Sequence, residues 1–342
     1  MQRTPARTAP RAARPYRNPA DARIDDDALQ VMYATYGSRA ARLPPVALVI
    51  AAYNEEGAIG PVIEELPRVV CGMPAEVIVV ADGCADETVK EADIAGAVVC
   101  AVPVNRGQGA ALRLAYRIAR EGGAEYIVST DADGQYNPAE IEPLLAPVVA
   151  GEAEFVTGSR RMGTEETRDP IRKAGVRFFA FLVSTLTGQR ISDTTFGLRA
   201  MRADVTAAVQ LEQPQYQASE LLIGVITHGY RVLEVPATIH KRKVGQSKKG
   251  HNFIYGLRFM RVVIGTWWRE RRRLGAACPC FAAAPRLARP RRLMRGLVPR
   301  TSASRCPRRH AAAAGRHPVQ SRRPGRRCPA RRTARSGRSR SG

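Results

Sequence analysis

Short apolar runs that alternate with polar loops and amphipathic segments constrain this fold more than any other feature of the sequence. The runs span residues 46–52, 75–81, 97–102 and 126–130, and residues 154–160 are predicted to form a further short strand and loop. Continuous apolar runs of this length are typical of strands buried on both faces of a parallel sheet. The segments between them are predicted to be helices, among them residues 59–70 and residues 110–121. We therefore predict an α/β fold, with a doubly wound, mostly parallel, Rossmann-like sheet.

Two aspartates, Asp131 and Asp133, follow the run at 126–130 in the stretch STDADGQ. In open α/β sheets, ligands bind at the carboxyl ends of the strands, where this pair is expected to lie. Carboxylates at this spacing can share one hard divalent cation, which fills its other positions with phosphate oxygens and water. Gly134 lets the chain turn sharply after the second aspartate. An acidic β-turn is the competing interpretation of DADG taken alone.

The net charge of +23 has little to do with the periodic part of the chain. Residues 269–342 contain 23 arginines, no lysine and one glutamate, so the preceding residues are nearly neutral. Nucleic acid is therefore not an expected partner of the core. A nucleic-acid-binding protein acting through this arginine-rich tail remains the alternative from another class. The biased composition of residues 274–342 also fits a sequence read past its natural end, and it predicts a disordered segment.

Cysteine usage and hydropathy indicate the cellular compartment in which the protein is expected to lie. The three core cysteines, Cys71, Cys84 and Cys100, flank apolar runs, where free thiols are common, so we expect a reduced, cytoplasmic environment. No run reaches the length of a membrane span. Residues 251–273 instead predict an amphipathic helix with arginines beside Trp267 and Trp268. Such a helix suits the inner face of the cell membrane, while docking on the core is the equally weighted alternative. The arginines of the predicted stripe are Arg258, Arg261, Arg269 and Arg272.

Seven stretches together resemble one known family. In order they are ALVIAAYNEE, VIVVADGCADET, NRGQGAAL, STDADGQYNP, EFVTGSR, DTTFGLRAM and RKVGQSKK. This series is similar to family-2 glycosyltransferases of GT-A fold, in the polyprenyl-phosphate (dolichyl-phosphate) mannose synthase-like branch. The resemblance covers about residues 46–249. The chain departs from the family pattern at Ala51, where proline is more usual, at Ala81, where a second aspartate is common, and in lacking C-terminal transmembrane helices.

The resemblance implies a metal-dependent, inverting transfer of a hexose from a nucleotide diphosphate sugar to a polyprenyl phosphate. It divides the chain into a mostly disordered extension (1–43), a catalytic domain (44–250, with a donor half to 161 and an acceptor half from 162), an amphipathic helix (251–273) and a tail (274–342). Asp131 and Asp133 would hold Mg²⁺ or Mn²⁺, with help from Gln135. The residues implied for the nucleotide are Ala51, Tyr53, Glu55, Asp82, Gly83, Gly107, Gly109 and Asp131.

The acceptor half carries the remaining implied residues. Asp193 matches an acidic position near the sugar, where it would orient a hydroxyl or act as a base, and Glu220 is a weaker candidate for the same work. Arg160 is either a phosphate contact or a strand-end charge. A lipid phosphate arrives already ionised and needs positioning by basic residues. The basic residues implied for it are Arg199, Arg242 and Lys248. A soluble acceptor, such as a phosphorylated acid or a sugar, is the alternative within the same fold.

Overall fold

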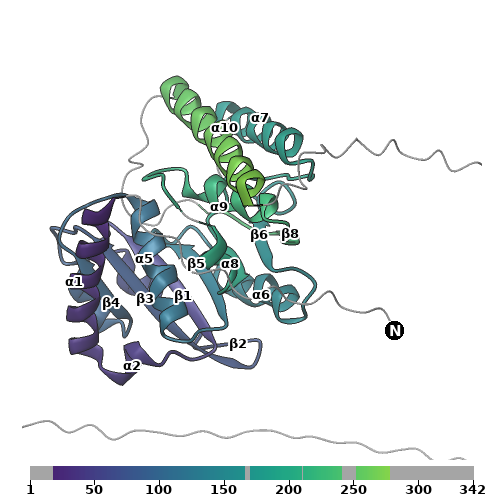
Figure 1. Cartoon of the computed structure of the whole chain (residues 1–342). Helices are drawn as coiled ribbons and strands as arrows, with labels where there is room; N and C mark the ends of the chain where they lie inside the picture. Colours follow the sequence, from purple (N-terminus) through teal and green to yellow (C-terminus); the bar gives the residue numbers. More distant parts are fainter. Residues whose placement is uncertain (1–17, 166–169, 210, 241–251, 278–342) are drawn as a thin grey trace, which may run out of the picture. The chain divides into compact units, whose positions relative to one another are not determined.

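The computed structural model describes residues 18–165, 170–209, 211–240 and 252–277 of the chain (Figure 1). Arg242 and Lys248 therefore lie outside the described residues. The strands are β1 (Val46–Ala52), β2 (Val69–Val70), β3 (Met73–Asp82), β4 (Val98–Val102), β5 (Tyr126–Asp131), β6 (Phe155–Ser159), β7 (Arg199–Arg202) and β8 (Val232–Pro236). The helices are α1 (Pro19–Tyr36), α2 (Ser38–Ala41), α3 (Ile59–Glu65), α4 (Thr88–Ile94), α5 (Gln108–Glu121), α6 (Ile141–Val149), α7 (Pro170–Thr187), α8 (Val205–Ala208), α9 (Gln217–Thr227) and α10 (Asn252–Ala277).

One sheet joins both halves of the chain. Its order is β2-β3-β1-β5-β7-β6-β8, and β4 pairs with the other edge of β3. The pairs of β1 with β3 and β5, of β3 with β4 and of β6 with β8 are parallel. Strand β7 runs antiparallel between β5 and β6, and the two residues of β2 pair antiparallel with β3. The predicted mostly parallel α/β fold is confirmed.

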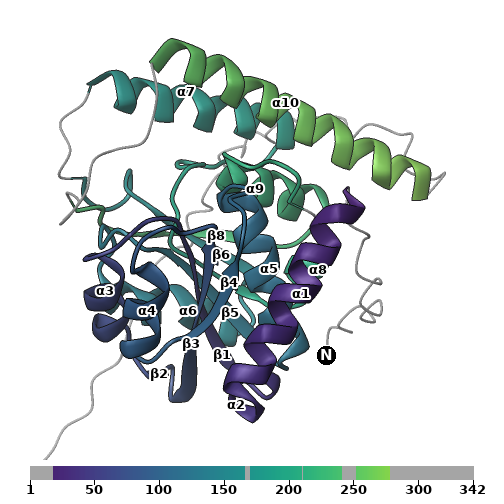
Figure 2. The same ribbon diagram turned by 90° about the vertical axis from the view of Figure 1, so that its left-hand side faces the viewer.

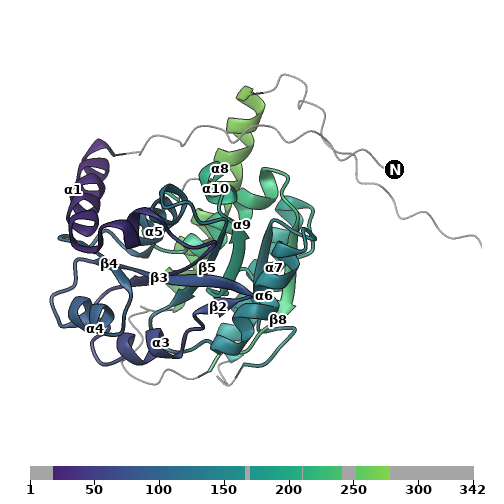
Figure 3. The same cartoon turned by 90° about the horizontal axis from the view of Figure 1, so that it is seen from below.

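Helices cover both faces of the sheet (Figure 3). On one face, α1, α5, α8 and α9 close a core with the alternate residues of the strands, among them Val49, Val80 and Ile127. On the other face, α3, α4 and α6 pack on the intervening residues, such as Leu48, Val79 and Val128. Both faces of the central strands are therefore buried, as their uninterrupted apolar sequence requires.

The structure corrects the expectation that residues 1–43 are mostly disordered, because residues 19–41 form α1 and α2. The side chain of Asn18 caps α1 by accepting a hydrogen bond from the backbone N–H of Ala20, and Pro19 occupies the first turn, where no N–H is needed. Leu29 and Met32 are buried against the core. Few apolar positions hold this helix, which is why its periodicity was too weak to predict it.

A second correction concerns the helix predicted over residues 59–70. Helix α3 stops at Glu65, and Val69 and Val70 form β2 instead. Pro67 accounts for this ending, because a proline disfavours helical backbone in the residue before it, here Leu66, whose φ of −71° and ψ of 138° are extended.

Helices α7 and α10 pack together and against α9, beyond the end of the sheet that carries the site loops (Figure 2). Val183, Ile223, Phe259 and Val263 form a small separate core between them. In the described part of the chain, no helix is both long and apolar enough to span a bilayer.

Candidate active site

The candidate site lies where the strand order reverses. Strand β1 has β3 on one side and β5 on the other, and the chain visits β3 before it returns to β5. The register pairs Ala51 of β1 with Val80 of β3 and with Asp131 of β5, so the carboxyl ends of the three strands meet. Ligands of open α/β sheets bind in the crevice at such a switch point. The predicted nucleotide residues Ala51, Asp82 and Asp131 are thus brought to one edge.

The loops after β1 and β3 are tied to each other. The side-chain oxygen of Asn54 accepts from the backbone N–H of Ala85 at 2.9 Å, and the N–H of Glu55 donates to the Thr88 hydroxyl at 2.8 Å. Tyr53 precedes the two residues that make these hydrogen bonds, and it is 40 % exposed. Tyr53 and Glu55 therefore stand on a fixed turn at the rim of the switch point, as a nucleotide contact would require.

Asp82 is buried at the end of β3, and one of its carboxylate oxygens accepts two hydrogen bonds. Its Oδ2 accepts from the backbone N–H of Arg106 at 2.8 Å and of Gly107 at 2.7 Å. Burial raises the pKa of the carboxyl, against the effect of those two hydrogen bonds. Its Oδ1 is buried and has no hydrogen-bond partner among the residues that the structure describes. One buried carboxylate oxygen therefore lacks a hydrogen bond where a base N–H was predicted, with Nε of Arg106 3.8 Å away.

Three predicted glycines are explained by neighbouring backbone of the chain itself. A Cβ on Gly83, whose φ is +71°, would lie 2.2 Å from the backbone nitrogen of Asn105. On Gly107 and Gly109 it would lie 2.7 Å from the carbonyl oxygen of Pro214 and 1.9 Å from that of Gln213. In the structure, these glycines let the loop at 105–109 pack between β3 and the segment before α9. Their implied role toward the nucleotide stays a prediction.

The two DADG carboxylates each accept a hydrogen bond from the chain. Oδ1 of Asp131 accepts from Nε2 of Gln108 at 3.0 Å, and Oδ1 of Asp133 accepts from the N–H of Gln135 at 3.1 Å. Over the described ranges, no group of three or more His, Cys, Asp or Glu side chains forms a metal cage. A pair of carboxylates nevertheless fits Mg²⁺ or Mn²⁺ that shares its shell with phosphates and water. The residues present are thus compatible with the predicted metal.

Arg199 lies inside the protein, beneath the DADG turn. It pairs with Ser129 in the β5–β7 ladder, two residues before Asp131. It is 3 % exposed, its guanidinium lies over the Phe155 ring, and its Nε finds no acceptor within the described residues. Burial lowers its pKa, while Tyr116, Tyr136 and Asp131 work in the opposite direction. This placement favours an electrostatic role close to the DADG turn over contact with a lipid head group at the surface.

Asp193 and Arg160 form a buried ion pair. Nε of Arg160 donates to Oδ2 of Asp193 at 2.6 Å, and the N–H of Thr195 donates to Oδ1 at 3.0 Å. Burial opposes the charge of Arg160, but the nearby Asp193 outweighs it and raises the pKa of the guanidinium. Both carboxylate oxygens of Asp193 are occupied, which favours an orienting role over that of a base. Arg160 belongs to this pair and is not an open strand-end charge.

Comparisons with known proteins agree with this geometry. Residues 47–209 match the model of glycosyl transferase family 2. A dolichyl-phosphate hexose transferase of Haloferax volcanii is 33 % identical over 203 residues, which are 59 % of this chain and 86 % of the relative. The chain belongs to glycosyl transferase family 2. It is a glycosyltransferase that uses a nucleotide sugar.

Two further comparisons concern the branch and the fold of this glycosyltransferase. An undecaprenyl-phosphate mannosyltransferase of Micrococcus luteus is 31 % identical over 219 residues, covering 59 % of this chain and 86 % of the relative. The glucosyl-3-phosphoglycerate synthase of Mycobacterium tuberculosis, solved with Mn²⁺, uridine diphosphate and phosphoglyceric acid, superposes with a TM-score of 0.52 at 21 % identity. That match covers 70 % of this chain and 82 % of that chain, and it shows the GT-A fold alone.

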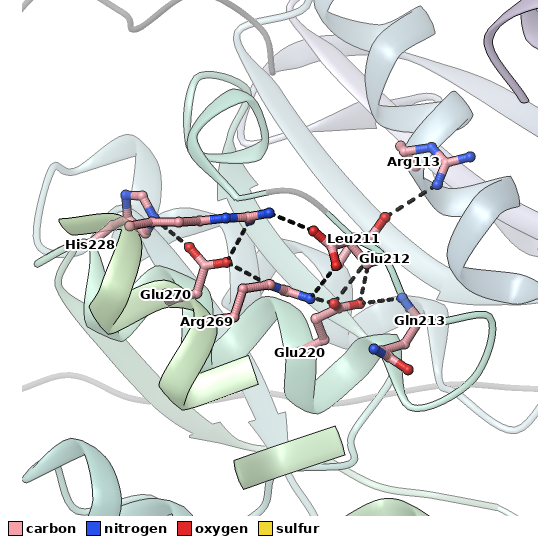
Figure 4. A network of polar contacts seen from close by, with 9 residues as sticks. Arg113, Leu211, Glu212, Gln213, Glu220, His228, Arg269 and Glu270 are labelled. Carbon is pink, nitrogen blue, oxygen red and sulfur yellow. Dashed lines mark hydrogen bonds and ion pairs between the residues drawn. The ribbon is translucent and has the colours of Figure 1, made fainter. Parts of the chain in front are cut away.

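Glu220 of the glycosyltransferase anchors a loop. It is fully buried, and it accepts hydrogen bonds from the backbone N–H groups of Glu212 and Gln213 at 3.0–3.1 Å and from Arg269 of α10 at 2.8 Å (Figure 4). Arg269 also contacts Glu212 and Glu270. The carboxylate is thereby committed to holding the segment before α9, which leaves it unsuited to the work predicted for Asp193.

Helix α10 docks on the core, which is one of its two predicted roles. It docks through Phe259, Val263 and the buried Glu270, so Arg269 does not belong to a solvated stripe. Arg258, Arg261 and Arg272 are exposed, as is the side chain of Trp268 over which Arg272 lies. Membrane contact of this helix stays a prediction.

His240 lies just before the basic stretch RKVGQSKK, which carries Arg242 and Lys248, and it contacts the residue that follows the DADG turn. The N–H of His240 donates to the carbonyl of Gln135 at 2.8 Å, and Nε2 of Gln135 donates back to the carbonyl of His240 at 2.9 Å. His240 is two residues before Arg242 in the sequence. Arg242 and Lys248 keep their predicted roles untested.

Sequence reasoning missed Gln108, Tyr136 and Arg106 at this site. Gln108 contacts Asp131, and the Tyr136 hydroxyl accepts from the N–H of Gly197 at 2.8 Å. Arg106 contacts Asp82 through its backbone. All three lie within stretches that carried the family resemblance, so the motif was visible while the function of each position was not.

Proposed function

We propose that this glycosyltransferase transfers a hexose from a nucleotide diphosphate sugar to a polyprenyl-type lipid phosphate, with inversion and with a divalent cation. The observation that carries the proposal is the pair Asp131 and Asp133 at the strand switch point of a chain whose relatives are named for dolichyl and undecaprenyl phosphate. Those relatives exceed 30 % identity over 86 % of their own length, which supports the same class of acceptor here.

The donor would bind across the ends of β1, β3 and β5. Asp131 and Asp133, with Gln135 nearby, would hold a cation that neutralises charge on the departing diphosphate. Oδ1 of Asp82 would accept an N–H of the base. The buried guanidinium of Arg199 would add positive potential near Asp131, where the diphosphate of the donor would lie.

The chemical step would be a single displacement. An ionised phosphate oxygen of the lipid forms a bond to the anomeric carbon as the bond from that carbon to the nucleotide diphosphate breaks, which inverts the configuration. The nucleophile needs no base because it is already ionised. This agrees with Asp193, whose carboxylate oxygens are taken by Arg160 and Thr195.

Exposed apolar side chains on α7 and α10 support an acceptor held in a membrane. Phe181 of α7 is 71 % exposed and Trp268 of α10 is 52 % exposed, while Phe178, Leu257 and Ile264 are also exposed. Arg258, Arg261 and Arg272 lie on α10 among them. A basic, aromatic surface of this kind suits the interface of an anionic bilayer.

The test is transfer from a panel of nucleotide sugars to a short-chain polyprenyl phosphate, with and without a chelator. We expect lipid-linked hexose of inverted configuration only when divalent cation is present, and a loss of at least about 100-fold in turnover for Asp133→Asn. The matched control is Asp204→Asn. Asp204 pairs with Arg202 at the opposite end of β5 from the site, so its turnover should be unchanged. Full turnover in chelator would contradict the metal, and product formed only on a water-soluble phosphorylated acid would replace the lipid acceptor.

A further inference from the structure

Helix α1 reaches the donor site, although it lies outside the region that matches the family model. It packs along β4 at the edge of the sheet (Figure 1). Asp25, on its inner side, is fully buried, and its Oδ1 lies 2.6 Å from Nη2 of Arg106. Nη1 of Arg106 also donates to the backbone carbonyl of Asp21 at 3.3 Å. The helix therefore fixes the side chain of a residue in the loop that Asp82 anchors.

Arg106 stands between two buried carboxylates, and its distances to them differ. Its guanidinium makes a short ion pair with Asp25, whereas Nε remains 3.8 Å from Oδ1 of Asp82. Three buried polar atoms in this group lack a hydrogen-bond partner within the described residues. They are Oδ2 of Asp25, Oδ1 of Asp82 and Nε of Arg106.

The two carboxylates compete for one guanidinium. An arginine side chain that no other contact constrains often binds a carboxylate through two parallel hydrogen bonds. If Asp25 released it, Arg106 could close the 3.8 Å gap and bind Oδ1 of Asp82, the oxygen that its own loop leaves open. A buried unpaired carboxylate oxygen is costly, so this closure would be favourable in the absence of a ligand.

We propose that Asp25 is a positioning residue for the nucleotide donor. By holding Arg106, it keeps Oδ1 of Asp82 without a hydrogen bond from the chain, so that this oxygen can accept one from an N–H group of the nucleobase. The inference rests on the proposed function, since it takes Asp82 to face the base. It assigns to α1 a part in donor recognition, and the chemistry that it serves is an N–H donor on a nucleoside diphosphate.

The first experiment compares two aspartates of α1 in the full chain. Asp26 pairs with Arg117 of α5 at 2.7 Å, so Asp26→Asn breaks a similar tie between the same helix and the core without touching Arg106. For Asp25→Asn we expect the Kd for the best-binding member of a UDP, GDP, CDP and ADP panel to rise about tenfold or more, the usual order for one hydrogen bond to a charged group. The donor KM should rise equally, with kcat unchanged at saturation. For Asp26→Asn, neither constant should change.

The second experiment separates positioning from simple support of the fold. In Asp25→Asn/Arg106→Gln, the guanidinium that would capture Asp82 is gone, so nucleotide affinity should recover most of its loss. If α1 merely supports the fold, nucleotide affinity in the wild type and in both variants will follow the free energy of unfolding measured in urea, because removing both partners of a buried pair also restores stability. A double variant that binds as weakly as Asp25→Asn, or an Asp25→Asn chain that binds as tightly as the wild type, overturns the inference while the proposed function stands. A wild-type chain that binds no nucleoside diphosphate overturns both.

Discussion

At the scale of single residues, close backbone packing accounts for three glycines at the site. Gly83, Gly107 and Gly109 each face a backbone atom of this chain at a distance that no Cβ would tolerate. The loop they belong to then gives two amide hydrogens to Asp82, from Arg106 and Gly107. Small residues are therefore required here because three segments of backbone meet.

Gly109→Ala tests this requirement. The added Cβ would lie 1.9 Å from the carbonyl oxygen of Gln213, so the variant must shift backbone at a cost of about 1–3 kcal/mol in the free energy of unfolding. Because Gln108 next to it contacts Asp131, the donor KM should rise as well. Urea unfolding and initial rates measure the two effects.

The matched control for that substitution is Gly175→Ala inside α7, where a Cβ meets nothing within 4 Å. A glycine-to-alanine change in an open helical position should stabilise the protein by about 0.5–1 kcal/mol. Equal effects of the two alanines would mean that packing around Gly109 does not shape the site.

At the scale of elements, α10 is held by charge as much as by apolar contact. Glu270 is buried between His228 of α9, at 2.9 Å, and Arg269 and Arg273 of its own helix, at 3.0 and 3.1 Å (Figure 4). Burial alone would raise the pKa of Glu270, but these partners lower it to about 2. The ionised carboxylate is thus stabilised by folding.

This lowered pKa predicts how stability depends on pH. A carboxyl whose pKa falls on folding stabilises the native state fully above its unfolded value, here 4.5, and loses that contribution as pH falls toward about 2. Between about pH 5 and about pH 3, the wild type should therefore lose more free energy of unfolding than Glu270→Gln does. Glu87→Gln, which removes an exposed partner of Lys90, is the control and should leave the pH slope unchanged. Parallel slopes for Glu270→Gln and wild type would contradict a buried, ionised Glu270.

At the scale of the whole molecule, α7 and α10 lie side by side against α9 (Figure 2), and both helices carry exposed apolar side chains. The sheet beneath them carries the site at the ends of β1, β3 and β5. A lipid phosphate presented from a bilayer would need such an apolar surface to dock the enzyme. The arrangement therefore links the proposed acceptor to the outer helices.

Vesicle binding tests that link. The arginine-rich segment after Arg273 should bind anionic vesicles by charge alone, and salt should screen this attraction. At high salt, we expect the remaining co-sedimentation of the full chain with vesicles to fall several-fold for Phe181→Ser and for Trp268→Ser. These variants remove apolar area that would be buried in the membrane interface. Val31→Ser on α1 removes a side chain that is 65 % exposed in another helix and should have no effect. Equal binding of all three variants at high salt would remove α7 and α10 from the membrane contact.

The sequence by itself determined the α/β class, the order of the central strands along the chain and the position of Asp131 and Asp133 at a strand end. These features depend on local patterns, because a continuous apolar run must be buried on both faces and a polar turn must end it. The family motifs likewise located the loops after β1, β3 and β5. The helix predicted to end at Val70 was wrong because the effect of Pro67 was overlooked.

Only the tertiary structure decided which groups meet. The pairing of Asp25 with Arg106 joins residues 81 positions apart, and that of Arg269 with Glu220 joins residues 49 apart. Nothing in the local pattern of either residue names its partner, since an aspartate on a polar helix and a glutamate near a helix start are ordinary surface residues. The packing of α1 and α10 on the core removes these charges from water, and burial then obliges each to find an opposite charge or a hydrogen bond.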